Sequence, residues 1–170
     1  QRRILAATVD GIRIINLYVV NGSEVGSEKF DYKLLWLEKV TDWLAGEIEA
    51  HPNLVVVGDF NIAPDDRDVY DPEAWREKIL CSTPEREALE RILGLGLEDT
   101  FRLFEQDDSV FSWWDYRMNM FRRKLGLRID LVLASKAMAR RCSASYIDIE
   151  PRRQERPSDH APAIAEFDTA

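Results

Sequence analysis

The sequence predicts an α+β domain, with a layered α/β/β/α arrangement of its helices and sheets. Short segments of strand-like pattern recur along the chain, and two or three segments of helical period lie among them. Of the 170 residues, 45% are hydrophobic and 32% are charged, which is the balance of an ordinary globular protein. A chain of this length can bury one real core, so we expect a single domain over residues 1–170.

The strands are predicted from alternation and from short apolar runs. Residues 4–9 and 12–20 are joined by Asp10-Gly11, a pair that favours a tight hairpin. Further strand-like segments cover residues 54–58, 110–117, 127–134, 142–149 and 161–167.

The helices are predicted from apolar residues at helical spacing. Residues 28–49 carry such a row, which includes Phe30, Leu37 and Leu44. A second helix is expected from Thr83, as the N-cap, to the glycines at 94 and 96. Residues 62–79 have no clear period and predict a long surface loop with one turn of helix.

Charge and cysteine content narrow the class of protein. The net charge of −8 argues against non-specific binding of nucleic acid over the whole surface, and it suits a protein that gathers divalent cations. The longest apolar runs are far shorter than a membrane-spanning helix. Cys81 and Cys142 form no C-x-x-C motif, so we expect two buried thiols. Free thiols indicate a reducing compartment, and we expect the cytoplasm. The sequence is also compatible with a disulfide between them.

The segment VVVGDFNIAPDD, residues 55–66, places a carboxylate and an amide at the tip of an apolar strand. Gly, Asp, Asn and Pro make turns, and a turn alone would explain them. Alternatively, Asp59 and Asn61 point into a site, because residues two apart in an extended chain lie on the same side.

Three other polar positions follow or interrupt strand-like runs: Tyr18, Asp130 and the pair Asp159-His160. Tyr18 alone reads as a strand aromatic and Asp159 as a turn residue, but Asp130 lies in an apolar run and needs a partner. His160 is the natural one, oriented as in any Asp–His pair.

Together with Asp59 and Asn61, these residues suit phosphodiester hydrolysis. Their hard oxygen ligands favour Mg²⁺ or Mn²⁺, and zinc is disfavoured because the chain has only two histidines and scattered cysteines.

Five segments resemble bacterial exonuclease III, of the endonuclease/exonuclease/phosphatase superfamily, in order and spacing. They are GDFNIAP, CSTPERE, FSWWDYR, GLRIDLVLAS and PSDHAP, and the resemblance runs through nearly the whole chain. It implies a four-layered α/β/β/α sandwich. It also implies a DNA-repair enzyme with 3′→5′ exonuclease, abasic-site endonuclease and 3′-phosphatase activities on double-stranded DNA.

The resemblance also implies roles for individual residues. Asp59 would transfer a proton near the metal, Asn61 would stabilise the transition state, and Tyr18 would contact the scissile phosphate. Asp130 would orient His160, which would bind the phosphate or assist the base. The metal ligands would be Asp59, Asn61 and Asp159.

Trp113, in FSWWDYR, would form the aromatic wall of the pocket that accepts an extruded abasic sugar. The basic loop that follows, residues 116–128, is expected to contact the DNA backbone rather than being merely a solvated surface. Its cations are Arg117, Arg122, Arg123, Lys124 and Arg128.

The sequence departs from the family at its start. The resemblance implies an opening segment that supplies the first strands of one sheet, an Asn and a Glu that binds metal, and neither motif occurs here. We therefore expect an incomplete domain. The isolated chain is expected to bind metal weakly, to be inactive, and to expose strand edges and self-associate, whereas the parent protein is expected to be a monomer.

Two other functions compete with DNA repair. One is a phosphodiesterase of the same superfamily that acts on inositol phosphates or sphingomyelin, against which the basic loop and Trp113 argue. The other is a catalytically inactive DNA-binding module that retains the scaffold.

Overall fold

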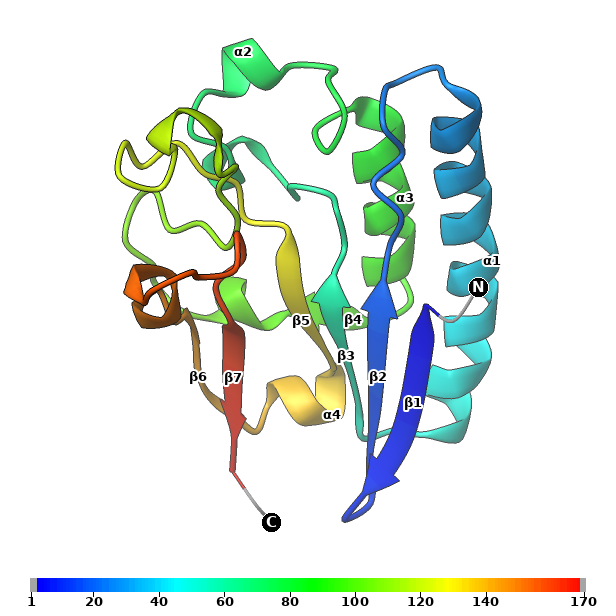
Figure 1. Ribbon diagram of the computed structural model, residues 1–170. Helices are drawn as coiled ribbons and strands as arrows, with labels where there is room; N and C mark the ends of the chain where they lie inside the picture. The colour runs from blue at the N-terminus through cyan, green and yellow to red at the C-terminus, as the bar shows by residue number, and fades with distance from the viewer. Residues whose placement is uncertain (1–2, 169–170) are drawn as a thin grey trace.

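The computed structural model describes residues 3–168, and its centre is a five-stranded mixed sheet in the order β1-β2-β3-β5-β4 (Figure 1). The β1–β2 hairpin turns at Asp10 and Gly11, as the sequence predicts. β2 and β3 run parallel, and β3 and β5 run antiparallel. The strands of this sheet are Ile4–Val9 (β1), Ile12–Tyr18 (β2), Leu54–Asp59 (β3), Leu97–Asp99 (β4) and Asp130–Ser135 (β5).

The remaining elements within residues 3–168 are two longer helices, two short ones, four short 3₁₀ turns and a second, two-stranded sheet. The helices are Glu28–Ala50 (α1), Pro72–Trp75 (α2), Thr83–Leu93 (α3) and Lys136–Ala139 (α4). The second sheet pairs Cys142–Ile147 (β6) with Ala163–Phe167 (β7). The 3₁₀ turns are Asp66–Asp68 (η1), Thr100–Leu103 (η2), Arg117–Asn119 (η3) and Glu150–Arg153 (η4).

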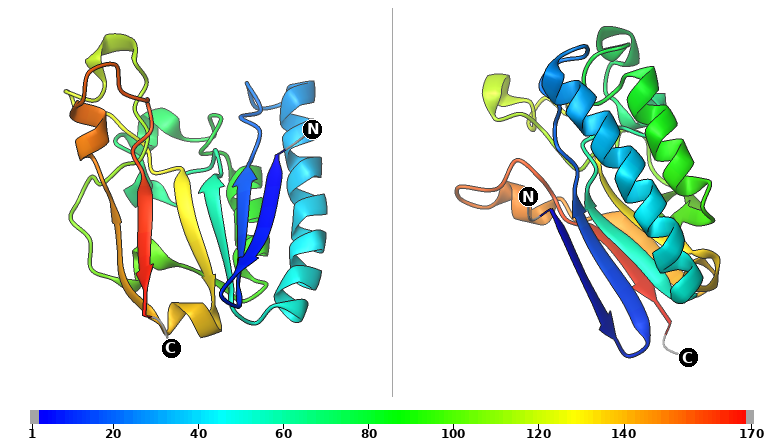
Figure 2. Two further views of the ribbon diagram at one scale, coloured as in Figure 1. Left: turned by 60° about the horizontal axis from the view of Figure 1, so that its bottom comes forward. Right: turned by 90° about the vertical axis from the view of Figure 1, so that its right-hand side faces the viewer.

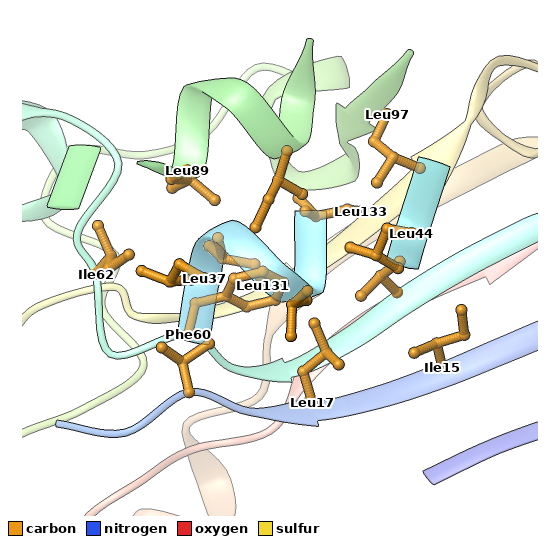
Figure 3. Close-up of a cluster of buried hydrophobic side chains, with 14 of the residues drawn as sticks. Ile15, Leu17, Leu37, Leu44, Phe60, Ile62, Leu89, Leu97, Leu131 and Leu133 are labelled. Atoms are coloured by element: carbon orange, nitrogen blue, oxygen red, sulfur yellow. The ribbon is translucent and has the colours of Figure 1, made fainter. Parts of the chain in front are cut away.

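The main core lies between the five-stranded sheet and the helices α1 and α3, which cover one face (Figure 2). Alternation along each strand sends every second side chain to this face, where it is removed from water. Figure 3 shows how strand and helix side chains interdigitate there. The labelled members of this cluster are Ile15, Leu17, Leu37, Leu44, Phe60, Ile62, Leu89, Leu97, Leu131 and Leu133.

The opposite face of the sheet packs against β7. Val55 and Val132 point to this side, and Ala163, Ala165 and Phe167 pack against their cluster. The structure therefore has helix, sheet and sheet in that order, and the α+β class is confirmed. Among residues 3–168, we find no long helix on the outer side of the second sheet, where a four-layered sandwich has its last layer.

Two expectations about secondary structure were wrong. Residues 110–117 form no strand, and Trp113 makes only isolated bridges to Leu127 and His160. The second helix is capped by Ser82 rather than Thr83, because the Ser82 side chain and Glu85 complete a reciprocal capping box.

Part of the apolar surface of residues 3–168 is open to solvent. β1 is an edge strand, and its Leu5 is 71% exposed. A groove of about 390 Å³ runs between the open face of the large sheet and β7, and its lining includes Ile14, Val57 and Phe167. Self-association of the chain stays a prediction. Both cysteines are free, and no helix within residues 3–168 is long and apolar enough to cross a membrane.

A buried ion cluster fixes the segment that leads into β5. Arg128 is fully buried, and its guanidinium donates to Asp68 at 2.6 Å and to Asp99 at 2.7 Å. The guanidinium also lies 4.6 Å from the centre of the Phe101 ring. The expectation that Arg128 contacts DNA is therefore wrong, because both carboxylates and the protein interior enclose its charge.

Replacing Arg128 with methionine tests this cluster. The change leaves the carboxylate of Asp99 without its counterion and that of Asp68 with Arg102 alone, so we expect the free energy of unfolding to fall by about 3–5 kcal/mol. Urea denaturation measures the loss. The matched control is Arg67→Met, which breaks the exposed pair with Asp65 and should hardly move the midpoint. Equal losses in the two variants would contradict a buried, structural Arg128.

Candidate active site

Three polar side chains lie in one row at the end of the sheet where β2 and β3 terminate. In the pairing register, Tyr18 is opposite Asp59, and Asp59 is opposite Asp130 (upper edge of the sheet in Figure 1). Asp59 lies two residues after Val57 and Asp130 two before Val132, so both carboxylates point to the face covered by β7. Residues distant in sequence are thus brought together by the strand register.

Asn61 reaches this row through a turn. β3 ends at Asp59, and Asn61 adopts the left-handed conformation with φ of 48°. Its backbone N–H donates to Asp59 Oδ1 at 2.8 Å, and its Nδ2 donates to Asp59 Oδ2 and to the carbonyl of Val19, each at 2.9 Å. Turn and site are therefore both present, although the alternation that predicted their proximity does not apply to Asn61.

Asp130 and His160 form the expected pair. His160 Nδ1 lies 2.8 Å from Asp130 Oδ2, and the Ser112 hydroxyl donates to the same oxygen at 2.6 Å. Ser112 Oγ also accepts the backbone N–H groups of Ile129 and Asp130, both at 3.0 Å. The imidazole is thereby held by one nitrogen, which leaves Nε2 to face a ligand.

Trp113 and Asp159 are joined directly. The indole Nε1 donates to Asp159 Oδ2 at 3.0 Å, and the backbone of Trp113 bridges to Leu127 and His160. The tryptophan belongs to a small apolar cluster with Leu127 and Ile129. It therefore lies beside the Asp–His pair with an apolar wall behind it.

A cavity of about 470 Å³ opens next to these groups. Gly58, Asp130 and His160 line it, together with Ser158 and apolar residues of β5 and of the segment before β7. Tyr18, 48% exposed, stands at the end of β2, and the guanidinium of Arg3 lies 5.2 Å from the centre of its ring.

The surroundings of the site perturb the pKa of Asp59 and that of His160. Burial and the neighbouring charge of Asp130 raise the pKa of Asp59 to about 6, against the opposing effects of His160 and Asn61. Burial opposes a charge on His160, but the hydrogen bond and charge of Asp130 outweigh it and raise the pKa of the imidazole. The arrangement thus favours the protonated form of both Asp59 and His160 more than water does.

The oxygen donors at the site suit a hard divalent cation but do not enclose one. Among residues 3–168, no group of three or more His, Cys, Asp and Glu side chains converges on one point. Mg²⁺ keeps several waters and is often held by one or two carboxylates, so the described residues fit a partial, water-completed coordination shell.

Within the basic loop, residues 116–128, the stretch 116–124 is largely open to solvent, whereas residues 126–128 are buried. Arg122, Arg123 and Lys124 are exposed, whereas Arg117 forms an exposed pair with Asp115. This segment is anchored by the buried Arg152, whose guanidinium lies within 6.0 Å of the ring centres of Trp114, Tyr116 and Phe121.

Three residues of the site were missed at the sequence level. Ser112 is a small polar residue inside an aromatic run, and Asn21 follows the tip of β2 as Asp59 ends β3. Asn21 Nδ2 donates to Asn61 Oδ1 at 3.2 Å. Lys33 donates to the Asn61 carbonyl at 2.7 Å, and its signal was a charge within the apolar row of a helix.

Substituting Asp59 with asparagine should stabilise the metal-free fold at high pH. The folded state raises the pKa of Asp59 to about 6, so this carboxyl costs stability as the pH rises from its unfolded value of about 4. A neutral amide avoids that cost. In EDTA we expect Asp59→Asn to gain about 1–3 kcal/mol above pH 7 and to gain little at pH 4.

Thermal or urea unfolding at both pH values measures this gain. Asp42→Asn, at an exposed position on α1, is the matched control and should show no such pH dependence. A gain independent of pH would show that the carboxyl is not perturbed by its surroundings.

Comparison with known proteins assigns the chain to a family. The sequence model of the Endonuclease/Exonuclease/phosphatase family matches residues 2–160. Exodeoxyribonuclease III of Haemophilus influenzae is 36% identical over 179 residues, which covers 98% of this chain and 67% of that protein.

Two solved structures extend the comparison. A 3′ phosphatase from Neisseria, solved with a product DNA hairpin, superposes with a TM-score of 0.97 at 51% identity, over 99% of this chain and 66% of that one. An AP endonuclease from Archaeoglobus fulgidus gives 0.92 at 38% identity, over 98% and 65%. This chain spans about two thirds of the length of these relatives. The chain belongs to the Endonuclease/Exonuclease/phosphatase family.

Proposed function

We propose that this protein is a divalent-metal-dependent DNA-repair phosphodiesterase, with 3′→5′ exodeoxyribonuclease and abasic-site endonuclease activity on double-stranded DNA. The observation that carries the proposal is the convergence of the Asp59–Asn61 turn and the Asp130–His160 pair at one edge of the sheet. The relatives support the substrate, since they include an exodeoxyribonuclease, an AP endonuclease and a phosphatase solved with DNA.

Each residue has a role that its contacts permit. Asp59, ionised above pH 6, accepts a proton from the attacking water. His160, held through Nδ1 by Asp130, presents Nε2 to the phosphate, and its raised pKa favours the protonated form that binds an anion. Tyr18 contacts the scissile phosphate from the neighbouring strand.

Asn61 donates a hydrogen bond to Asp59 before the reaction and to the phosphate during it. Both hydrogens of its Nδ2 are donated in this structure, to Val19 and to Asp59. A carboxyl that has taken up a proton is a weaker acceptor, so protonation of Asp59 would release one N–H toward the phosphate oxygen. The amide thereby stabilises charge as it develops in the transition state.

A divalent cation, Mg²⁺ or Mn²⁺, is proposed at the oxygen atoms of Asp59, Asn61 and Asp159. When bound, it neutralises charge on the phosphate and the leaving oxygen. The like charges of Asp59 and Asp130 in adjacent register positions support the proposal, because a cation relieves their repulsion.

DNA binding is proposed for Trp113 and for the exposed cations Arg117, Arg122, Arg123 and Lys124. The partly exposed ring of Trp113, backed by the buried Leu127, suits a sugar without a base, and the exposed cations suit backbone phosphates. A cytoplasmic location is proposed as well, because both cysteines are free thiols, as is usual in a reducing compartment. Burial raises the pKa of the Cys81 thiol to about 12, which leaves that thiol unreactive.

Cleavage of a duplex with one abasic site tests the function. We expect incision with Mg²⁺, none with EDTA, and a loss of at least about 10²-fold in Asp59→Ala and His160→Ala. Asp42→Ala, at an exposed position on α1, should cut like the wild type.

Three other results would each change the assignment. Duplex binding without incision in any metal would favour a non-catalytic module. Hydrolysis of inositol phosphates or sphingomyelin in place of DNA would favour the other branch of the superfamily. Activity that survives in both site variants would remove the chemistry from these residues.

A further inference from the structure

Lys33 is a charged side chain in the apolar face of α1, and it is fully buried. All three of its ammonium hydrogens have an acceptor. Nζ donates to the carbonyl of Asn61 at 2.7 Å, to the carbonyl of Asn21 at 3.1 Å, and to the carboxylate of Glu85. Two of the three acceptors are therefore backbone atoms of the asparagines at the site.

Glu85 is an anchor for this lysine. It is also fully buried, and it accepts the Ser82 hydroxyl at 2.6 Å and the backbone N–H groups of Ser82 and Leu80, both at 3.2 Å. Its carboxylate is thus fixed by the start of α3. Burial lowers the pKa of Lys33, and Glu85 opposes that effect by favouring the charged form.

The contacts of Lys33 reach the two groups that shape the site. Asn61 has a positive φ of 48°, which costs a non-glycine residue energy, so its peptide must be held by its surroundings. Asn21 and Asn61 also bond to each other through their side chains at 3.2 Å. The ammonium group therefore ties together two loop tips that come from different strands.

A buried ion pair often adds little net stability, because its replacement by apolar residues of similar volume is often neutral or stabilising. The pair of Lys33 and Glu85 therefore needs another explanation. An apolar side chain, however, would leave the Asn21 and Asn61 carbonyls without a donor at the turn that carries the Asp59 contacts.

We propose that Lys33, anchored by Glu85, is a positioning residue that holds Asn61, and through it Asp59, in the arrangement the reaction needs. The inference rests on the proposed function for its kinetic part. Its structural part, the hold on the Asn61 amide, is independent of any activity.

The test compares Lys33→Met with Leu37→Ala. Met fills similar space without donors, whereas Leu37 lies one turn further along α1 in the main core, and its aliphatic side chain makes no hydrogen bond to these polar groups. For Lys33→Met we expect the ¹H–¹⁵N signals of the Asn61 side-chain amide to shift or broaden. On abasic duplex we expect kcat to fall by about 10²-fold with KM little changed.

Leu37→Ala should lose thermal stability but keep the Asn61 signals and stay within about twofold of the wild-type kcat in the folded protein. Lys33→Gln, which retains a donor, should lie between the wild type and Lys33→Met in both readouts. If Lys33→Met does not fold, the comparison of Lys33→Gln with Leu37→Ala decides the test.

Unchanged Asn61 signals in the lysine variants, or kinetic losses equal to that of Leu37→Ala, would overturn the inference and leave Lys33 as a stability residue. The two failures are distinguishable. A wild-type protein that does not cut abasic DNA contradicts the proposed function, while the amide signals still decide the role of Lys33.

Discussion

The register of β2, β3 and β5 is the constraint on which the site depends. A slip of one residue in any of these strands would reverse its side chains and bury the wrong face, so packing of the core also fixes the row of Tyr18, Asp59 and Asp130. Gly58 makes this pairing possible. A Cβ atom there would lie 1.9 Å from the carbonyl oxygen of Leu17, and its φ of 139° is open to glycine alone.

Buried cations support the segments that carry the site. Arg128 holds Asp68 and Asp99 two residues before Asp130, and Lys33 holds the turn that contains Asn61. At the site itself, burial and the neighbouring charge of Asp130 raise the pKa of Asp59, and this is the cost of placing the two acids there. Paired charges thus stabilise the frame, and like charges are kept together where a cation would be bound.

The sequence predicted those parts of the fold whose signals are local. Periodicity placed the hairpin, α1 and β3, and turn residues at strand tips pointed to Asp59, Asn61 and His160. Local signals did not show which cations of the basic loop, residues 116–128, are buried and which are exposed. Arg128 looks like its exposed neighbours, and its burial is decided by Asp68, which lies 60 residues away.

The run of aromatic residues around Trp113 was wrongly predicted to be a strand for a similar reason. Its composition is that of a strand, but its backbone finds only isolated bridges. Ser112 and Lys33 depend on long-range partners too, since their roles follow from Asp130 and from Asn61. Contacts between distant segments thus determined what the local pattern could not show.

The most direct measurement is a crystal structure with a short duplex that carries a non-cleavable abasic site and with Mg²⁺. The account predicts that the scissile phosphate lies within hydrogen-bonding distance of Asn61 and His160, with the abasic sugar against Trp113. A duplex bound elsewhere on the protein, with no phosphate beside the row of Tyr18, Asp59 and Asp130, would contradict it.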